Sequence, residues 1–260
     1  MQFFGKSDTG IKRTENQDSF ITEQLNENTV LCLVCDGMGG ANGGSTASSL
    51  ACSTFLKNIK KHLPEIQEPT QLEFEGRITK IENILKKAVT ATNTAVFRKA
   101  TKSKDLAGMG TTLVCALIID EFLYIVNVGD SRLYGFVNGD MVQITRDHSY
   151  VQTLVDLGQL TPEEATHNPH KNIITKAIGV HKSEEPDIFF DNLSASDAEY
   201  LLLCSDGLTN FAELDTIKSI VLGDGTLEEK CDKLIETANE NGGGDNITVV
   251  LVKTKDQGGI

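Results

Sequence analysis

Residues 30–45 read Val-Leu-Cys-Leu-Val-Cys-Asp-Gly-Met-Gly-Gly-Ala-Asn-Gly-Gly-Ser, and the organisation of the chain is clearest from this stretch. Six apolar residues, 30–35, end abruptly at Asp36, and five glycines follow within the next eight residues. The apolar run predicts a buried strand that carries one carboxylate at its tip. Backbone without side chains beyond that tip would let a small charged ligand come close. Taken alone, a strand followed by an ordinary Asp-Gly turn is the simpler interpretation.

Three later aspartates occupy similar positions. Asp130 and Asp206 each come shortly after an apolar run, and Asp245 stands just before the last one. An isolated Asp at a strand end is usually a turn residue or a helix cap. If these strands pair, however, the carboxylates would lie close together and repel one another unless a cation were bound. Oxygen ligands suit Mg²⁺ or Mn²⁺, and the lack of suitably spaced His or Cys ligands disfavours Zn²⁺.

The composition is that of a globular protein, with 260 residues, of which 39% are hydrophobic and 23% charged. The net charge of −13 argues against a nucleic-acid or anionic-membrane surface. Six cysteines lie mostly inside apolar runs and are interpreted as buried thiols in a reducing compartment. No apolar run approaches the ~18 residues that a membrane-spanning helix needs. We therefore expect a soluble, cytoplasmic protein.

Apolar periodicity predicts the secondary structure. Strands are expected near residues 2–9, 18–23, 30–35, 111–119, 122–128, 133–137, 141–144, 200–204 and 247–253. Helices are expected from Ser45 to about residue 63, over 78–96, at 149–157, from 161, and near 212–222 and 227–240, with 64–76 as a loop or helix start. Adjacent strands joined by tight turns, above all Asn138-Gly139, indicate antiparallel pairing.

This order of elements predicts an α+β fold with a central antiparallel β-sandwich and helices on both faces, in four layers. No linker, internal repeat or low-complexity tract divides the chain. We therefore expect a single domain over residues 1–254, followed by a loose tail at 255–260.

Several short motifs carry a resemblance that spacing alone could not establish. They are Arg13-Thr-Glu-Asn-Gln-Asp18, Val34-Cys-Asp-Gly-Met-Gly-Gly40, Gly110-Thr-Thr112, Val128-Gly-Asp-Ser-Arg132, Cys204-Ser-Asp-Gly-Leu208 and Gly244-Asp-Asn-Ile-Thr248. In this order and at these separations they resemble the metal-dependent protein phosphatase family, type 2C, in its compact bacterial form. The resemblance covers about residues 5–252 and implies the β-sandwich described above, with a metal cluster at one end.

The resemblance also implies metal ligands, with two or three Mg²⁺ or Mn²⁺ ions per chain. Matched by position, Asp36 would bridge two ions, and the Gly37 carbonyl would bind the second. Asp206 and Asp245 would complete the first ion's site, and Asp18 would hold a metal-bound water.

A third ion would be held by Asp130 together with Asp206, as in bacterial relatives. Arg13 would bind the substrate phosphate, because a guanidinium fork matches its geometry. Alone, Arg13 would be read as a surface charge. The implied reaction is direct attack on phosphorus by a hydroxide that bridges two metals, with no phosphoenzyme. Consistent with this, no Cys in the chain is followed six positions later by Arg.

The implied substrates are proteins phosphorylated on serine or threonine, and the enzyme would be a monomer that reverses a serine/threonine kinase. The alternative is an inactive member of the same fold that regulates a protein partner. The presence of Arg13 and of every expected carboxylate disfavours that alternative.

Three features remain open. Met38 stands where some relatives carry a His that is a candidate general acid, and methionine cannot donate a proton, so the proton donor has no assigned residue. Residues 146–172 resemble the mobile flap beside the bacterial active site, and a solvated surface loop is the alternative interpretation. His148 is expected either to touch the site or to be a hydrogen-bonded structural residue.

Overall fold

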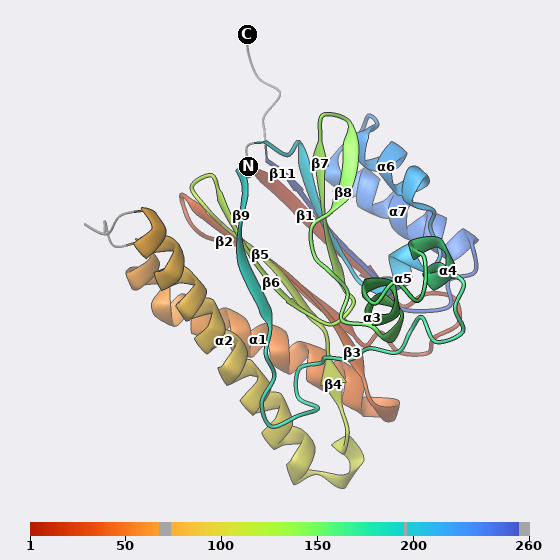
Figure 1. Ribbon diagram of the computed structural model, residues 1–260, viewed down its shortest axis with the longest axis horizontal. Coiled ribbons are helices and arrows are strands. Elements are labelled where there is room, and N and C mark those ends of the chain that lie inside the picture. The colour runs from red at the N-terminus through yellow and green to blue at the C-terminus, as the bar shows by residue number, and fades with distance from the viewer. Residues whose placement is uncertain (68–73, 195–196, 255–260) are drawn as a thin grey trace.

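The computed structural model describes residues 1–67, 74–194 and 197–254, and these residues form two packed sheets with helices on both sides (Figure 1). This is the predicted α+β sandwich. The expected loose tail at 255–260 lies outside the described residues. Among the described helices, none is long and apolar enough to cross a membrane.

The first sheet is antiparallel throughout and has the strand order β1-β11-β10-β7-β8. Its strands are β1 (Gln2–Asp8), β7 (Arg132–Val137), β8 (Asp140–Gln143), β10 (Tyr200–Cys204) and β11 (Ile247–Lys253). The predicted hairpin is formed by β7 and β8. Its turn residues, Asn138 and Gly139, have φ values of 53° and 81°, as a tight two-residue turn requires.

The second sheet has the order β2-β3-β5-β6-β9, and a short strand, β4, also pairs with β3. Its strands are β2 (Asp18–Asn26), β3 (Thr29–Met38), β4 (Gly110–Thr111), β5 (Leu113–Ile119), β6 (Phe122–Val128) and β9 (Asp187–Ser194). Strand β9 is not among the strands expected from the sequence. It pairs antiparallel with β6 at the edge of the sheet.

Each sheet is covered by a pair of helices. Helices α1 (Gly40–Gln67) and α2 (Phe74–Lys102) pack on the second sheet, while α6 (Leu214–Leu222) and α7 (Leu227–Glu240) pack on the first. The shorter elements are η1 (Lys104–Leu106), α3 (Tyr150–Asp156), α4 (Pro162–Thr166) and α5 (Asp206–Thr209). In Figure 1, α3 and α4 lie together beside one end of the sandwich.

Alternation along β3 explains how the sandwich places a carboxylate at its end. Val30, Cys32 and Val34 pack against the other sheet, whereas the residues between them face α1 and α2. Because side chains alternate with a period of two, Asp36 continues the series that points between the sheets. The strand therefore ends with its carboxylate at the mouth of the inter-sheet core.

Helix α1 is longer than predicted. It begins at Gly40 instead of Ser45 and continues through Pro64 to residue 67, where a loop or helix start was expected. The glycines in its first turns permit close packing. A Cβ on Gly44 would lie 2.4 Å from Gln17 Oε1, and one on Gly43 would lie 3.2 Å from the Met109 Cβ. The periodicity of apolar residues could not show that the helix begins at Gly40, because these glycines pack against Gln17 and Met109 from other parts of the chain.

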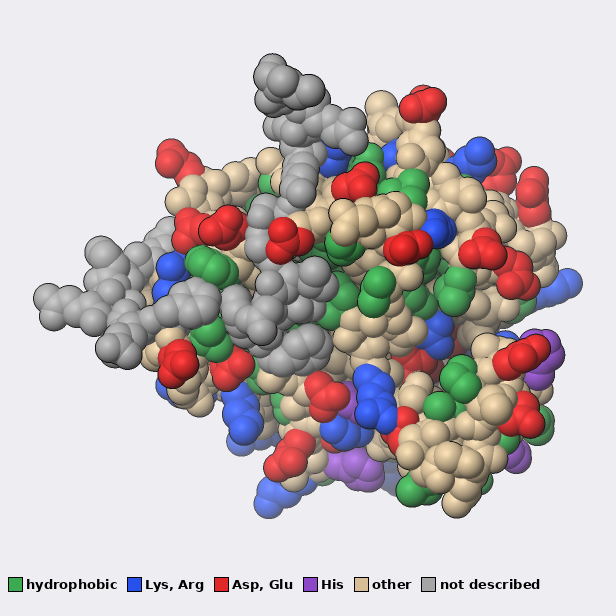
Figure 2. All heavy atoms as spheres, turned by 45° about the horizontal axis from the view of Figure 1, so that its top comes forward, with side chains coloured by type: hydrophobic (Ala, Val, Ile, Leu, Met, Phe, Trp, Pro, Cys, Tyr) green, Lys and Arg blue, Asp and Glu red, His purple; other side chains and the backbone are tan. Residues whose placement is uncertain are grey.

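All six cysteines are buried and free, as expected. Burial raises the pKa of Cys32 and of Cys204 to about 12, so neither thiol is a reactive thiolate at neutral pH. On the face shown in Figure 2, acidic side chains are scattered among lysines and arginines over the described residues.

Candidate active site

A cavity of about 570 Å³ opens at the end of the sandwich where β3, β6 and β10 terminate and β11 begins. It is lined by six of the seven predicted site residues, namely Arg13, Asp36, Gly37, Asp130, Asp206 and Asp245. The seventh, Asp18, is 8% exposed and does not line the cavity. It lies directly opposite Asp36 in the β2–β3 register. The structure thus gathers residues that are far apart in the sequence.

The backbone of Asp36 is fixed by two threonines. Asp36 N donates to Thr112 Oγ1 at 2.9 Å, and Asp36 O accepts from Thr112 N and from Thr111 Oγ1, both at 2.8 Å. Thr112 Oγ1 also contacts Ser131 Oγ at 2.6 Å. Sequence reasoning gave these threonines no role, although Gly110-Thr-Thr112 was one of the recognised motifs.

Only one of the two carboxylate oxygens of Asp18 has hydrogen-bond partners. Its Oδ2 accepts from Ser205 Oγ and from Thr248 Oγ1, both at 2.7 Å. Its Oδ1 is buried and has no hydrogen-bond partner. A buried carboxylate oxygen without a partner is costly, so it marks a place for a further polar ligand.

Asp206 shows the same pattern. Its Oδ2 accepts from Asn210 Nδ2 at 2.8 Å, while its Oδ1 is buried and unpartnered. Asp245 is more open, and its Oδ1 accepts from Asn246 N at 2.9 Å. Asn246 is 5% exposed, and its side chain bonds to the backbone of Thr9, Glu15 and Gln17. It is a further positioning residue that sequence reasoning missed, although it adjoins Asp245 in a recognised motif.

Arg13 lies at the rim of the cavity, with its side chain 51% exposed. Its Nη2 donates to Asp245 Oδ2 at 2.8 Å, and its Nε donates to Gly244 O at 3.4 Å. The predicted phosphate-binding residue therefore contacts a predicted metal ligand.

Gly37 and Met38 line the cavity beside Asp36. Gly37 N donates to Gln17 O at 3.1 Å, and a Cβ on Gly37 would lie 2.1 Å from Gly44 O. Because no side chain fits there, packing alone requires a glycine at this position, whatever the Gly37 carbonyl binds.

His148 is not among the cavity-lining residues. Burial lowers its pKa, and it bonds to Gly129, which supports the structural interpretation.

The acidic residues destabilise one another electrostatically. Burial, followed by the charges of the neighbouring aspartates, raises the pKa of Asp36 well above its ordinary value. Burial also raises the pKa of Asp18 to about 7 and that of Asp130 to about 8, again with like charges adding to the rise. For Asp206, the positive charge of Arg132 and the hydrogen bond from Asn210 oppose the rise in pKa that burial and Asp245 cause.

These properties fit a hard divalent cation. The donor set consists of oxygen atoms, two buried carboxylate oxygens lack partners, and added positive charge would relieve the repulsion. Among the described residues, no three His, Cys, Asp or Glu side chains already meet as a ready-made metal-binding group. The carboxylates share a cavity, but their oxygens do not converge on one point.

Comparison with known proteins identifies the family. A sequence model described as Protein phosphatase 2C matches residues 10–251, nearly the whole chain. The chain belongs to the protein phosphatase 2C family. The serine/threonine phosphatase stp of Listeria monocytogenes is 38% identical over 248 residues, which cover 95% of this chain and 94% of that protein. The protein phosphatase PhpP of Streptococcus pneumoniae is 37% identical over 254 residues, 96% of each chain.

Solved structures agree with this assignment. The serine/threonine phosphatase Stp1 from Staphylococcus aureus superposes with a TM-score of 0.86 at 35% identity, covering 98% of this chain and 95% of that one. The serine/threonine phosphatase PstP/Ppp of Mycobacterium tuberculosis gives 0.82 at 34% identity, covering 98% and 99%. The resemblance drawn from the short motifs is thus confirmed over almost the full length.

Proposed function

We propose that this member of the protein phosphatase 2C family is a serine/threonine protein phosphatase that depends on Mg²⁺ or Mn²⁺. The observation that carries the proposal is the shared cavity in which Asp36, Asp130, Asp206 and Asp245 meet Arg13. Carboxylates of this kind can hold hard cations, and a guanidinium can hold a phosphate. The names of the relatives, which are serine/threonine phosphatases, support the same substrate class.

Two or three cations would be held by the cavity's oxygen atoms. Asp36 and the Gly37 carbonyl, with Asp206 and Asp245, are the proposed ligands of the first two. Asp130 is proposed to share a third ion with Asp206. When bound, the cations would supply Lewis acidity to water and to the phosphate oxygens.

The chain's own residues would contribute binding and orientation. Asp18, which is buried opposite Asp36 in the β2–β3 pairing, would orient a water through its unpartnered Oδ1. Arg13 would bind and orient the phosphate from the rim, where its exposed side chain would exchange its contact with Asp245 for one with the substrate. Met38 lines the cavity but has no proton to give, so the leaving alcohol must take its proton from another donor.

The catalytic unit is proposed to be residues 1–254, acting as a monomer on phosphoproteins of the cytoplasm and opposing a serine/threonine kinase. Residues 146–172 are proposed to form a flap, since Asn172 lines the active-site cavity from the end of that segment. No observation among the described residues favours the inactive regulatory alternative.

The experiment that tests the function compares three phosphopeptides of one sequence, phosphorylated on serine, threonine or tyrosine, with the purified chain and millimolar Mn²⁺. Release of phosphate from the first two, and little from the third, is expected. An absence of release from all three would favour the inactive regulatory alternative.

A further inference from the structure

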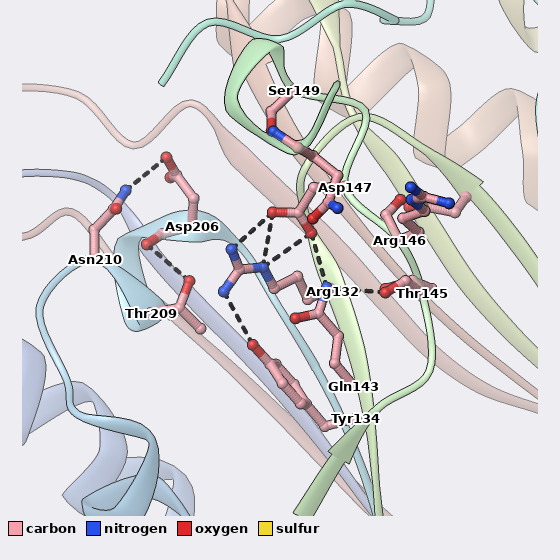
Figure 3. Close-up of polar contacts among 12 residues, drawn as sticks. Arg132, Tyr134, Gln143, Thr145, Arg146, Asp147, Ser149, Asp206, Thr209 and Asn210 are labelled. Atoms are coloured by element: carbon pink, nitrogen blue, oxygen red, sulfur yellow. Dashed lines mark hydrogen bonds and ion pairs between the residues drawn. The ribbon is translucent and has the colours of Figure 1, made fainter. Parts of the chain in front are cut away.

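The side chains of Arg132 and Asp147 form a fork between β7 and the start of residues 146–172 (Figure 3). Arg132 Nε donates to both carboxylate oxygens of Asp147 at 3.0 Å, and Nη2 donates to Oδ2 at 2.7 Å. Arg132 Nη1 donates to the Tyr134 hydroxyl at 3.1 Å, and Gln143 Nε2 donates to Asp147 Oδ1 at 2.9 Å. The Asp147 side chain is 9% exposed, so this pair differs from solvent-exposed ion pairs that contribute little.

The fork anchors one end of the turn that carries Asp130, because Arg132 stands two residues after it. The other end is held by the residue after Asp147. His148 N donates to Gly129 O at 2.8 Å, and Gly129 N donates to His148 Nδ1 at 3.1 Å. Asp147 and His148, two consecutive residues at the start of the 146–172 segment, therefore hold the turn that carries Asp130 on both sides.

A second cavity, of about 330 Å³, adjoins the active-site cavity and shares Asp130, Asn172 and Asp206 with it. Arg132 and Asp147 line this second cavity. Its apolar wall comes from α3 and α4 through Val151, Val155, Pro162 and Ala165. The ion pair thus stands where the carboxylates of the active site meet the helices of the 146–172 segment.

Arg132 also supplies positive charge to the acidic residues. Asp130 and Asp206 line the same second cavity as its guanidinium group. Arg132 lines only the second cavity, not the one that would hold substrate. It can therefore influence the site through Asp130 and Asp206 without contacting a substrate.

We propose that Arg132 and Asp147 are positioning residues, whose fork fixes the Asp130 turn and the start of the 146–172 segment in one arrangement beside the active site. This inference rests on the proposed function, because the proposed function is what assigns a cation to Asp130. The loss of a residue that orients a metal ligand typically weakens metal binding by about 10- to 100-fold.

The test measures Mn²⁺ binding to the metal-stripped full chain by titration calorimetry. Asp147→Asn keeps the size of the side chain but removes its charge, and Arg132→Lys keeps the charge but cannot form the fork. Each variant is expected to bind at least one ion about 10- to 100-fold more weakly than the unmodified chain. The double variant is expected to lose no more than either single variant, because the two residues act as one unit.

A matched control is Arg77→Met, which breaks another ion pair, with Asp120, whose N–O distance is 3.0 Å. Both residues lie on a different cavity, so Mn²⁺ affinity should stay unchanged. Circular dichroism establishes that each variant is folded. If Asp147→Asn does not fold, Arg132→Lys decides the outcome alone.

Unchanged Mn²⁺ affinity in a folded fork variant, beside an unmodified chain that binds Mn²⁺ and hydrolyses phosphopeptide, overturns this inference and leaves the proposed function standing. If the unmodified chain itself binds no Mn²⁺, the proposed function fails, and the inference fails with it.

Discussion

Arg13 and Asp245 form an ion pair at the rim of the active-site cavity, with 2.8 Å between Arg13 Nη2 and Asp245 Oδ2. One of these residues is proposed to bind the substrate phosphate and the other to hold a cation. Their roles are coupled, because the carboxylate that pairs with the guanidinium is the one that a cation would engage. Cation binding at Asp245 would weaken its hold on Arg13 and leave the guanidinium available to phosphate.

Arg13→Ala is expected to raise KM for a phosphothreonine peptide more than it lowers kcat. A hydrogen bond to a charged group contributes about 1.5–3 kcal/mol, and the exposure of Arg13 favours the lower end, which corresponds to about 10-fold. Steady-state kinetics at saturating Mn²⁺ measure this. Lys12→Ala, which removes the adjacent positive charge, serves as the control and should leave KM nearly unchanged. An unaltered KM in Arg13→Ala would remove this residue from the phosphate site.

Asp206→Asn is expected to abolish turnover while leaving the chain folded. The amide can keep the bond with Asn210 but cannot supply a second anionic oxygen to a cation. In the absence of metal the variant should be at least as stable as the unmodified chain, because one buried like charge is gone. Thermal melting with EDTA and a phosphatase assay with Mn²⁺ report the two effects. Near-normal turnover would show that the metal assignment is wrong.

The raised pKa of Asp18 predicts that the stability of the metal-free protein depends on pH. Its pKa is raised to about 7 in the folded chain, above its ordinary value of about 4. Between these pH values the folded chain holds a proton that the unfolded chain has released. The stabilising contribution is therefore complete below about pH 4 and is lost as the pH rises through about 7.

Melting temperatures measured in EDTA at a series of pH values across this range check that dependence. Asp18→Asn removes the titrating group and should make the decline with pH shallower, and Mn²⁺ should reduce the decline in the unmodified chain. A parallel decline in the two proteins would mean that Asp18 does not contribute to it.

Thr112→Val tests the support of Asp36. The substitution keeps the shape but removes the acceptor of the Asp36 N–H and the contact with Ser131. An unsatisfied buried donor costs about 1–3 kcal/mol of unfolding free energy. Denaturant titration measures the loss. Thr90→Val, on the exposed face of α2, is the control and should change the free energy of unfolding by less than about 0.5 kcal/mol. Equal stability of the two variants would contradict the assigned role of Thr112.

Local patterns in the sequence were sufficient for much of the fold. The last strand, β11, has the predicted bounds of residues 247 and 253, and the β7–β8 hairpin follows from Asn138-Gly139. Both signals depend only on neighbouring residues. Strand β9 was missed because its apolar run is interrupted by Asp191-Asn192, and its partner, β6, lies far away in the sequence.

The candidate site shows the same limit. Motif order was enough to select four aspartates that the fold brings to one cavity, namely Asp36, Asp130, Asp206 and Asp245. It did not reveal the pairing of Arg132 with Asp147, or the bonds from Asn246 to residues 9, 15 and 17. Those contacts join segments that only the folded chain brings together, so a pattern read along the sequence carries no signal for them.

The central claim is that the carboxylate cavity holds divalent cations for hydrolysis of phosphoserine and phosphothreonine. The most direct test is phosphate release from a phosphothreonine peptide by the metal-stripped chain as Mn²⁺ is titrated from zero to millimolar concentration. We expect no release without metal, a saturable rise with Mn²⁺, and no rise for Asp206→Asn. Equal release in the presence of EDTA, or none at millimolar Mn²⁺, would contradict the account.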